Sequence, residues 1–292
     1  MRVGPAGWAY ADWDGRVTPR KKPRSFHALA HLAKYVGCVE VNSSFYGLPL
    51  ARNAERWVRL VEDQPDFCFT AKLFQGFTHG ADLRGRERAL TLDSYRAGIA
   101  PLANAGRLWA LLAQFPLSFH RTHFNVERLE RIAGDFDPHP LILEVRHRSW
   151  FEPDGLRTIE KLGYSLATID LPAAPDHPPA DVAQVGPLGY LRLHGRNADA
   201  WFDSRAGRDQ RYDYLYNRAE VGELAAVARR LATGADETAV ITNNHFSGKA
   251  VANALELIGI FEGQLPLAPV EIVEAFPYLK TLVRLDGQTS LF

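Results

Sequence analysis

The sequence predicts an α/β protein, built as a single (β/α)8 barrel of the TIM type with an irregular sixth βα connection. Eight short apolar runs alternate along the chain with helical patterns. The 292 residues give about 36 residues to each strand–helix unit, which is the size of a unit in such barrels. The turns that follow the runs lack a full Gly-rich phosphate loop, and this argues against a doubly wound open sheet.

The expected strands are short and apolar. In chain order they cover 1–7, 38–42, 67–72, 108–115, 141–147, 164–170, 190–195 and 239–244. Two helices with clear boundaries are expected between the first three strands. One lies within the stretch 25–37, with Ser25 as N-cap and Gly37 just past its end, and the other lies within 53–65, with Asn53 as cap and Pro65 beyond its end.

Five further helical patterns cover 91–106, 125–134, 154–163, 219–234 and 247–263. The sixth connection, 171–187, is rich in proline, so no regular helix is expected there. We assign residues 1–283 to the barrel domain and 284–292 to a C-terminal tail.

The composition limits the class of protein. The 34 Lys and Arg balance the 34 Asp and Glu, so a broad electrostatic grip on nucleic acid is not expected, whereas a local basic pocket is allowed. Cys38 and Cys68 lie in apolar runs and are expected as core residues rather than a disulfide. The N-terminus lacks a signal-peptide pattern and no apolar run reaches 18 residues, so we expect a cytoplasmic protein with no membrane contact. The oligomeric state is left open.

Charged side chains occupy the second half of a strand that begins as a buried one. The stretch LILEVRHRSW starts with three aliphatic residues and continues with Glu144 and Arg146. These two side chains are two residues apart and therefore point to the same face. Burial of an ionised group is costly unless it is paired. In a barrel, however, the inward positions at the C-terminal ends of the strands face a pocket, where enzymes of this fold carry their sites.

The same arrangement recurs at the ends of other strands. The residues concerned are Glu40 and Asn42, Thr70 and Lys72, Gln114, Asp170, Arg192 and His194, and one of Asn243 and Asn244. We expect them to converge in one pocket. Aromatic residues that follow strand ends are expected to line or cap the same pocket. They are Trp8, Tyr10, Trp13, Phe45, Tyr46, Trp150 and Trp201.

Two interpretations need no anionic ligand. The carboxylates could neutralise the cations in a purely structural network. Alternatively, the carboxylates and His194 could hold a divalent metal. The cations Lys72, Arg146 and Arg192 would oppose a metal ion, and one histidine is too few for the zinc cluster of barrel nucleases. A divalent metal is therefore disfavoured, and we predict no metal ligands and no cofactor.

The third interpretation is an anionic ligand. Arg146 and Arg192 would clamp a phosphate or carboxylate. Lys72 would add a charge or, if desolvated, act as a base or Schiff-base nucleophile. The residues expected to move protons are Glu40, Glu144, Asp170 and His194.

Several stretches together resemble a known family, the YecE-like proteins or domain of unknown function 72. They are GPAGWAYADWDG, VEVNSSFYGLP, FCFTAK, LLAQFP, LEVRHRSWF, RLHGR and the Asn pair near the end, and they span nearly the whole chain. The resemblance implies a TIM-like barrel but no reaction. Ala6 stands where the family pattern has a serine. The family's motif residues map onto Trp8, Glu40, Asn42, Lys72, Gln114, Glu144, Arg146, His147, Arg192 and His194.

The hypothesis from the sequence is an enzyme that acts on a small phosphate- or nucleotide-like compound. Its catalytic candidates are Glu40, Lys72, Glu144, Asp170 and His194. Its substrate-binding candidates are Trp8, Asn42, Gln114, Arg146, His147, Arg192, Asn243 and Asn244. Two alternatives stay open: a nucleic-acid-associated binding or repair protein, and a metal-dependent phosphodiesterase of the endonuclease-like barrel type, which rests on analogy of fold alone.

The tail LDGQTSLF carries a candidate binding motif. Gln288 followed by two residues and then Leu291-Phe292 resembles the pentapeptide that binds bacterial sliding clamps. Gln offers a hydrogen-bonding anchor, and adjacent Leu and Phe fill an apolar pocket. Thr289 replaces the usual Leu, which removes one apolar contact worth on the order of 1 kcal/mol. The alternative is that Leu291 and Phe292 fold back onto the barrel.

Overall fold

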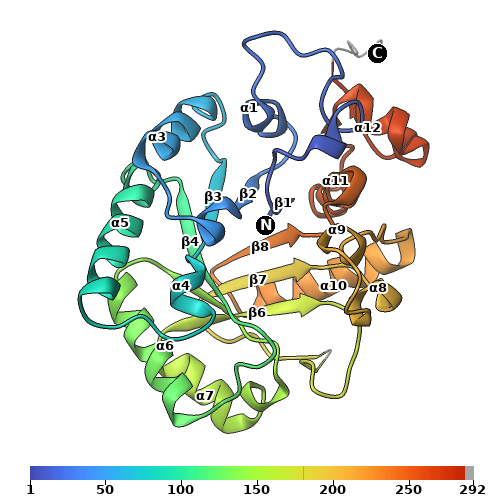
Figure 1. The fold of residues 1–292 in the computed structure, drawn as a ribbon. Coiled ribbons are helices and arrows are strands. Elements are labelled where there is room, and N and C mark those ends of the chain that lie inside the picture. Colours follow the sequence, from blue (N-terminus) through green and yellow to red (C-terminus); the bar gives the residue numbers. More distant parts are fainter. Residues whose placement is uncertain (180, 287–292) are drawn as a thin grey trace.

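All eight expected strands are present in the computed structural model, which describes residues 1–179 and 181–286 (Figure 1). They are β1 (Arg2–Pro5), β2 (Cys38–Val41), β3 (Cys68–Lys72), β4 (Leu108–Gln114), β5 (Leu141–Glu144), β6 (Tyr164–Asp170), β7 (Leu188–Leu193) and β8 (Glu237–Thr242). Each is parallel to its neighbours in the order β1-β8-β7-β6-β5-β4-β3-β2. A bridge between Ala6 and Glu40 joins the remaining edges of β1 and β2. The sheet is therefore a TIM-like barrel, as the sequence predicts.

Alternate residues of each strand face opposite sides of the barrel wall. Side chains such as Val39, Leu111, Leu143 and Leu191 pack outward against the helices. A second cluster fills the interior, and it includes Cys38, Cys68, Ala110, Leu112, Ile142, Ala167, Tyr190, Ala239 and Ile241. The two cysteines are register neighbours on β2 and β3 and are buried as free thiols. This agrees with their expected role as core residues.

Helices surround the strands on the outside of the barrel (Figure 1). They are α1 (Ala28–Leu32), α3 (Ala51–Leu60), α5 (Gly85–Asn104), α6 (His123–Phe136), α7 (Pro153–Lys161), α10 (Arg218–Thr233) and α11 (Lys249–Glu262). The described part of the sixth connection contains no helix, as expected. The loops at the C-terminal ends of the strands hold the short helices α2 (Ser43–Tyr46), α4 (Gln75–Thr78), α8 (Ala198–Phe202) and α9 (Arg208–Arg211), which the sequence did not indicate.

Two expected N-caps are wrong, and α1 ends at Leu32 rather than just before Gly37. The N-cap of α1 is His27 and not Ser25, because the His27 ring nitrogen accepts a hydrogen bond from the Leu29 amide at 3.2 Å. Helix α3 begins at Ala51, so that Asn53 lies inside its first turn, and Leu50 occupies the cap without a side-chain hydrogen bond.

The chain after α11 returns along the outside of the barrel beside α1 (Figure 1). It contains β9 (Leu267–Ala268), α12 (Val270–Ala275) and β10 (Arg284–Leu285), and β10 pairs with β9. The Tyr35 hydroxyl donates to Asp286 at 2.8 Å. Residues 284–286 therefore pack with the barrel. The motif residues Gln288, Leu291 and Phe292 lie outside the described residues.

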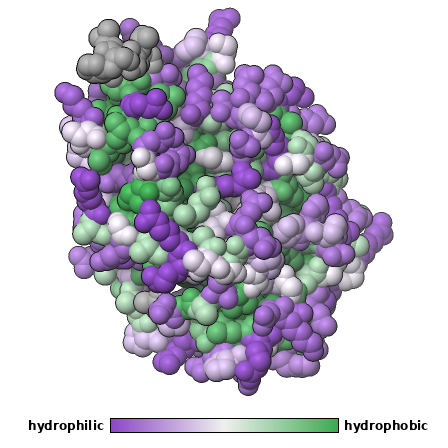
Figure 2. Space-filling model, turned by 180° about the vertical axis from the view of Figure 1, so that it is seen from behind, coloured by the Kyte–Doolittle hydropathy of each residue, from purple (hydrophilic) through white to green (hydrophobic). Residues whose placement is uncertain are grey.

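Polar side chains cover much of the face shown in Figure 2, and the hydrophobic patches between them are small. Within the described ranges, none of the helices combines the length and the apolar character that a membrane crossing requires.

Candidate functional site

Arg192 on β7 is the centre of a buried charge network at the C-terminal ends of the strands. Its guanidinium donates to Glu40 of β2 at 2.7 Å and to Glu144 of β5. All three side chains are at most 1% exposed. Burial alone would lower the pKa of Arg192, but Glu144 and Glu40 hold it above its ordinary value. Arg192 is thus a fixed cation that joins opposite sides of the barrel.

Tyr190 extends this network toward the barrel interior. Its hydroxyl donates to the second oxygen of Glu40 at 2.9 Å and lies 2.9 Å from the Thr70 hydroxyl. Burial and the Glu40 charge raise the pKa of Tyr190 well above its ordinary value. Glu40 is therefore held on both oxygens by side chains that remain protonated near neutral pH.

His194 follows Arg192 by two residues, just past the end of β7, and lies beside Glu144. The Asn243 amide contacts its Nδ1 at 2.9 Å, and its Nε2 lies 3.5 Å from the Glu144 carboxylate. Burial lowers the pKa of His194 to about 4, although Glu144 opposes that shift. Burial alone would raise the pKa of Glu144, but Arg192, His194 and Arg146 bring it well below the ordinary range. Near neutral pH the pair is a carboxylate beside a neutral imidazole.

Lys72 ends β3 at the same level. Its ammonium donates to Gln114 Oε1 at 2.8 Å and lies 4.2 Å from the centroid of the Phe45 ring. Burial, and after it the Arg192 charge, lower the pKa of Lys72 to about 8. Among the described residues, its ammonium has no carboxylate partner within 4.0 Å.

Arg146 follows β5 and is partly exposed. Its Nε and Nη2 donate to Glu144 at 3.2 and 3.0 Å, whereas Nη1 has no partner in residues 1–179 and 181–286. Trp201 lies beside the guanidinium, 5.8 Å from the ring centroid. The free nitrogen leaves two N–H donors of Arg146 for a ligand.

A cavity of about 320 Å³ opens onto these residues, within the size range of small-molecule sites. The described residues that line it are Tyr10, Asn42, Phe45, Tyr46, Lys72, Gln75, His79, Gln114, Arg146, Arg192, Tyr212, Asn243 and His245. They include three cations and no carboxylate. We call this cavity the mouth pocket.

Aromatic rings form the rim of the mouth pocket. Tyr10 stacks on His245 with 4.5 Å between ring centroids, and Tyr212 lies 5.4 Å from His245. Tyr46 is 61% exposed. Of the seven aromatics expected at the mouth, Tyr10, Phe45 and Tyr46 line the pocket, and Trp201 lies beside Arg146 and His194. Trp13 and Trp150 are core residues instead.

The structure brings together nine of the predicted site residues at the mouth. They are Glu40, Asn42, Lys72, Gln114, Glu144, Arg146, Arg192, His194 and Asn243. Four others lie elsewhere. Asp170 turns to the helix side of β6, where Arg196 donates to it at 2.8 Å and Tyr216 at 2.5 Å. Because its inward neighbour is Ile169, Asp170 cannot reach Glu144 from this strand.

Trp8, His147 and Asn244 also lie outside the mouth pocket. Trp8 packs edge-on against Trp57 of α3 at 5.2 Å. His147 lies beyond the end of β5, where strand alternation no longer applies, and stacks on His120 at 3.8 Å. Asn244 is the outward member of its pair and donates to the Tyr214 carbonyl and to Asn253.

Tyr190 and the pocket-lining residues Gln75, His79, Tyr212 and His245 are not among the residues predicted from the sequence. Tyr190 was detectable, because it precedes Arg192 by two residues and shares its face. His79 and Tyr212 follow short helices that the sequence does not indicate, so nothing placed them at the mouth. Burial, Lys72 and Arg146 lower the pKa of His79 to about 4.

Within residues 1–179 and 181–286, no group of three or more His, Cys, Asp or Glu side chains is arranged to hold a metal ion. The two carboxylates at the mouth are both hydrogen-bonded to Arg192.

Family comparison agrees with the fold and the motifs. The model of "Protein of unknown function DUF72" matches residues 2–271. The chain belongs to the DUF72 family. A curated relative, the UPF0759 protein YunF of Bacillus subtilis strain 168, is 27% identical in an alignment of 271 positions that covers 89% of this chain and 94% of the relative.

Two solved DUF72 structures have the same fold. A protein from Thermotoga maritima MSB8 is 31% identical, with a TM-score of 0.76 over 89% of this chain and 98% of its own. A protein from Enterococcus faecalis V583 is 26% identical, with a TM-score of 0.76 over 94% of this chain and 95% of its own.

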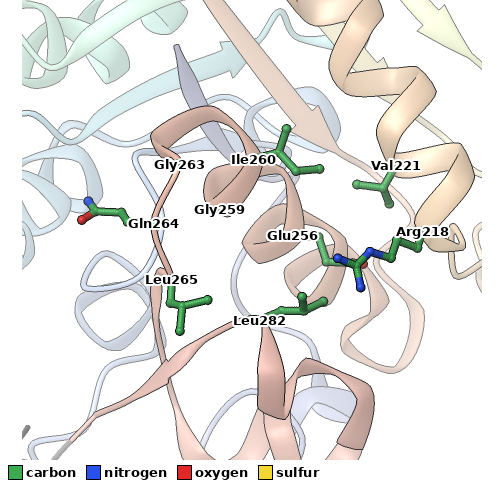
Figure 3. Close-up of a pocket in the computed structure, with 9 residues that line it drawn as sticks. All are labelled: Arg218, Val221, Glu256, Gly259, Ile260, Gly263, Gln264, Leu265 and Leu282. Carbon is green, nitrogen blue, oxygen red and sulfur yellow. The ribbon is translucent and has the colours of Figure 1, made fainter.

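This DUF72 barrel has a second, larger cavity on its outer wall (Figure 3). It measures about 480 Å³ and lies between α10, α11 and the segment that follows α11. Val221, Ile260, Leu265 and Leu282 give it an apolar lining, and Arg218 and Glu256 lie next to each other at one side of it (Figure 3). It shares no residue with the charge network. The mouth pocket is therefore the candidate functional site.

Proposed function

We propose that the mouth pocket binds a small ligand with an anionic group, and that this DUF72 protein is an enzyme acting on that ligand. The ligand class is a phosphorylated or nucleotide-like compound. The observation that carries the proposal is the charge of the pocket wall. Lys72, Arg146 and Arg192 line it, and none of its described lining residues is acidic.

The depth of the charges explains why the pocket favours an anion. Glu40 and Glu144 are fully buried and held by Arg192, so they compensate about two of the three positive charges from beneath. With His194 neutral, the cluster keeps a net charge of about +1. The surplus lies on Lys72 and Arg146, which are nearer the opening.

Each residue has a distinct role in this proposal. Arg146 contacts the anionic group through Nη1, and the amides of Asn42 and Asn243 add neutral hydrogen bonds. Arg192 positions both carboxylates and helps to keep Glu144 ionised. Glu144 and His194 form the pair that moves a proton, because a carboxylate next to a neutral imidazole can pass one through the ring.

A thermal-shift titration tests the proposal. Inorganic phosphate, sugar phosphates and nucleoside monophosphates should raise the melting temperature, and a compound at 100 times its dissociation constant adds about 2.7 kcal/mol. Arg146→Met should weaken binding by about ten- to a hundredfold, the value of a charge-assisted hydrogen bond. Arg148→Met is the matched control, because Arg148 is exposed and outside the pocket.

The outcome that contradicts the proposal is stabilisation by neutral sugars or by divalent metal ions alone. Duplex DNA provides a further comparison. A protein that grips several phosphates loses affinity steeply with salt, with a slope that reports their number. A pocket that holds one anionic group should show a slope near one.

A further inference from the structure

Lys72 is paired differently from the other cations at the mouth. Arg146 and Arg192 each contact Glu144, whereas the Lys72 ammonium contacts an amide oxygen and an aromatic ring. A lysine retained only to neutralise buried carboxylates would lie against them. Here Arg192 occupies that position, and Lys72 is left at the pocket wall with 8% of its surface exposed.

The surroundings of Lys72 increase the fraction of its neutral amine. It is desolvated, and the cations Arg192 and Arg146 are close enough to disfavour a further positive charge. These are the two conditions that activate lysine as a nucleophile. With a pKa of about 8, roughly a quarter of Lys72 is neutral at pH 7.5.

We propose that Lys72 forms an imine with an aldehyde or ketone group of the anionic substrate. This inference rests on the proposed function and narrows its substrate class to small carbonyl compounds that carry a phosphate or carboxylate. Arg146 holds the anionic group, and Lys72 reaches the carbonyl carbon from the neighbouring wall of the same pocket.

The step is balanced without a further reactant. The Lys72 nitrogen attacks the carbonyl carbon, a C–N bond forms, and the C–O bond then breaks. The oxygen leaves as water with two protons, and the iminium nitrogen keeps one, so an ammonium and a carbonyl give an iminium and water. The Phe45 ring, 4.2 Å from Nζ, faces the resulting cation, and Gln114 fixes the position of the nitrogen.

Borohydride trapping tests the imine directly. Pyridoxal 5′-phosphate is a suitable probe because it carries both an aldehyde and a phosphate, and pyridoxal is its phosphate-free match. After reduction, peptide mass spectrometry should locate the label on Lys72, at least tenfold above the exposed lysine Lys161. Inorganic phosphate should protect Lys72, and pyridoxal should label it at least tenfold less.

Variants separate this chemistry from surface labelling. Lys72→Met and Lys72→Arg should lose the trapped adduct, whereas Lys161→Met should keep it. Site mapping on the unaltered protein does not depend on whether either Lys72 variant folds.

The possible results also distinguish this inference from the proposed function. If phosphate compounds stabilise the protein but no adduct forms on Lys72, the imine is overturned and the anion pocket stands. If Lys72 is labelled equally by pyridoxal and pyridoxal 5′-phosphate, without protection by phosphate, the lysine chemistry stands and the anion pocket fails. Labelling spread evenly over exposed lysines overturns the imine.

Discussion

Arg192 holds two buried carboxylates, so replacing it should lower the free energy of unfolding. Arg192→Met leaves Glu40 and Glu144 fully buried without their cation. Breaking a buried pair in this way costs about 3–5 kcal/mol. We expect the free energy of unfolding, measured by urea denaturation at pH 7, to fall by that amount.

Two comparisons check the cause of that loss. Adding Glu40→Gln and Glu144→Gln to Arg192→Met removes the uncompensated charges and should recover most of the stability. Arg196→Met, at the more exposed pair with Asp170, should cost only about 1 kcal/mol. Equal losses for the two arginine variants would contradict the account of the buried network.

His194 should make stability depend on pH between its two pKa values. Its pKa is about 4 in the folded protein and about 6.5 when the chain unfolds. In that window the unfolded state binds more protons, so stability falls as the pH drops from about 6.5 toward 4. Glu144, whose folded pKa is depressed, adds a loss of the same sign, but only below its ordinary range near 4.3.

His194→Gln isolates the imidazole contribution. Denaturation curves at intervals from pH 7 to pH 4.5 should show a flatter pH dependence for the variant than for the unaltered protein. If the two profiles are parallel, His194 titrates alike in the folded and unfolded states, and the lowered folded-state pKa assigned to it is wrong.

At the level of strands, the alternation of residues accounts for what the sequence could and could not predict. Glu40, Lys72, Glu144 and Arg192 converge because each lies an even number of residues from an interior side chain of its own strand. The same rule, applied to β6, places Asp170 on the helix side of the strand and so excludes it from the mouth pocket. Alternation ends with the strand, so His147 could not be placed by it.

The loops at the C-terminal ends of the strands could not be predicted from strand alternation. Helices α2 and α4 have four residues each, too few to give a helical period. Their positions depend on buried contacts from distant strands, such as the hydrogen bond of 2.7 Å from the Ser44 hydroxyl to the Lys72 carbonyl. A sequence pattern does not contain that information.

Helix α5 should reject a substitution that helix propensity favours. A Cβ added at Gly98 would lie 2.1 Å from the Pro49 carbonyl oxygen. This clash is with the backbone, so a side-chain movement cannot relieve it. Gly98→Ala should therefore cost about 1–3 kcal/mol. Gly222→Ala in α10 has nothing within 4 Å and should gain about 0.5–1 kcal/mol. Thermal melts of both variants measure this, and a stabilising Gly98→Ala would show that the loop before α3 moves freely.

For the molecule as a whole, an even charge balance hides a strongly uneven distribution. The chain has no net charge, yet the wall of the mouth pocket carries three cations. Attraction of an anion is therefore local, and it acts within about 8–10 Å at physiological salt. Recruitment to a large polyanion such as DNA would need a separate contact, and the segment after Asp286 is the candidate.

Truncation at Asp286 separates that contact from folding. The described chain is anchored up to this residue by Tyr35, by the Ala268 carbonyl at 2.9 Å and by Arg284, which donates to the Leu265 carbonyl. Deleting 287–292 leaves those contacts in place, so the free energy of unfolding should change by less than about 0.5 kcal/mol.

If Gln288, Leu291 and Phe292 form a sliding-clamp motif, a peptide covering 284–292 should bind the clamp of the source organism, and Leu291→Ala with Phe292→Ala should abolish binding. Thr289, in place of the usual Leu, should weaken that affinity by about fivefold, the effect of one lost apolar contact of about 1 kcal/mol. The absence of binding at high micromolar peptide would refute the motif, and a marked loss of stability on truncation would show that the segment contributes to packing instead.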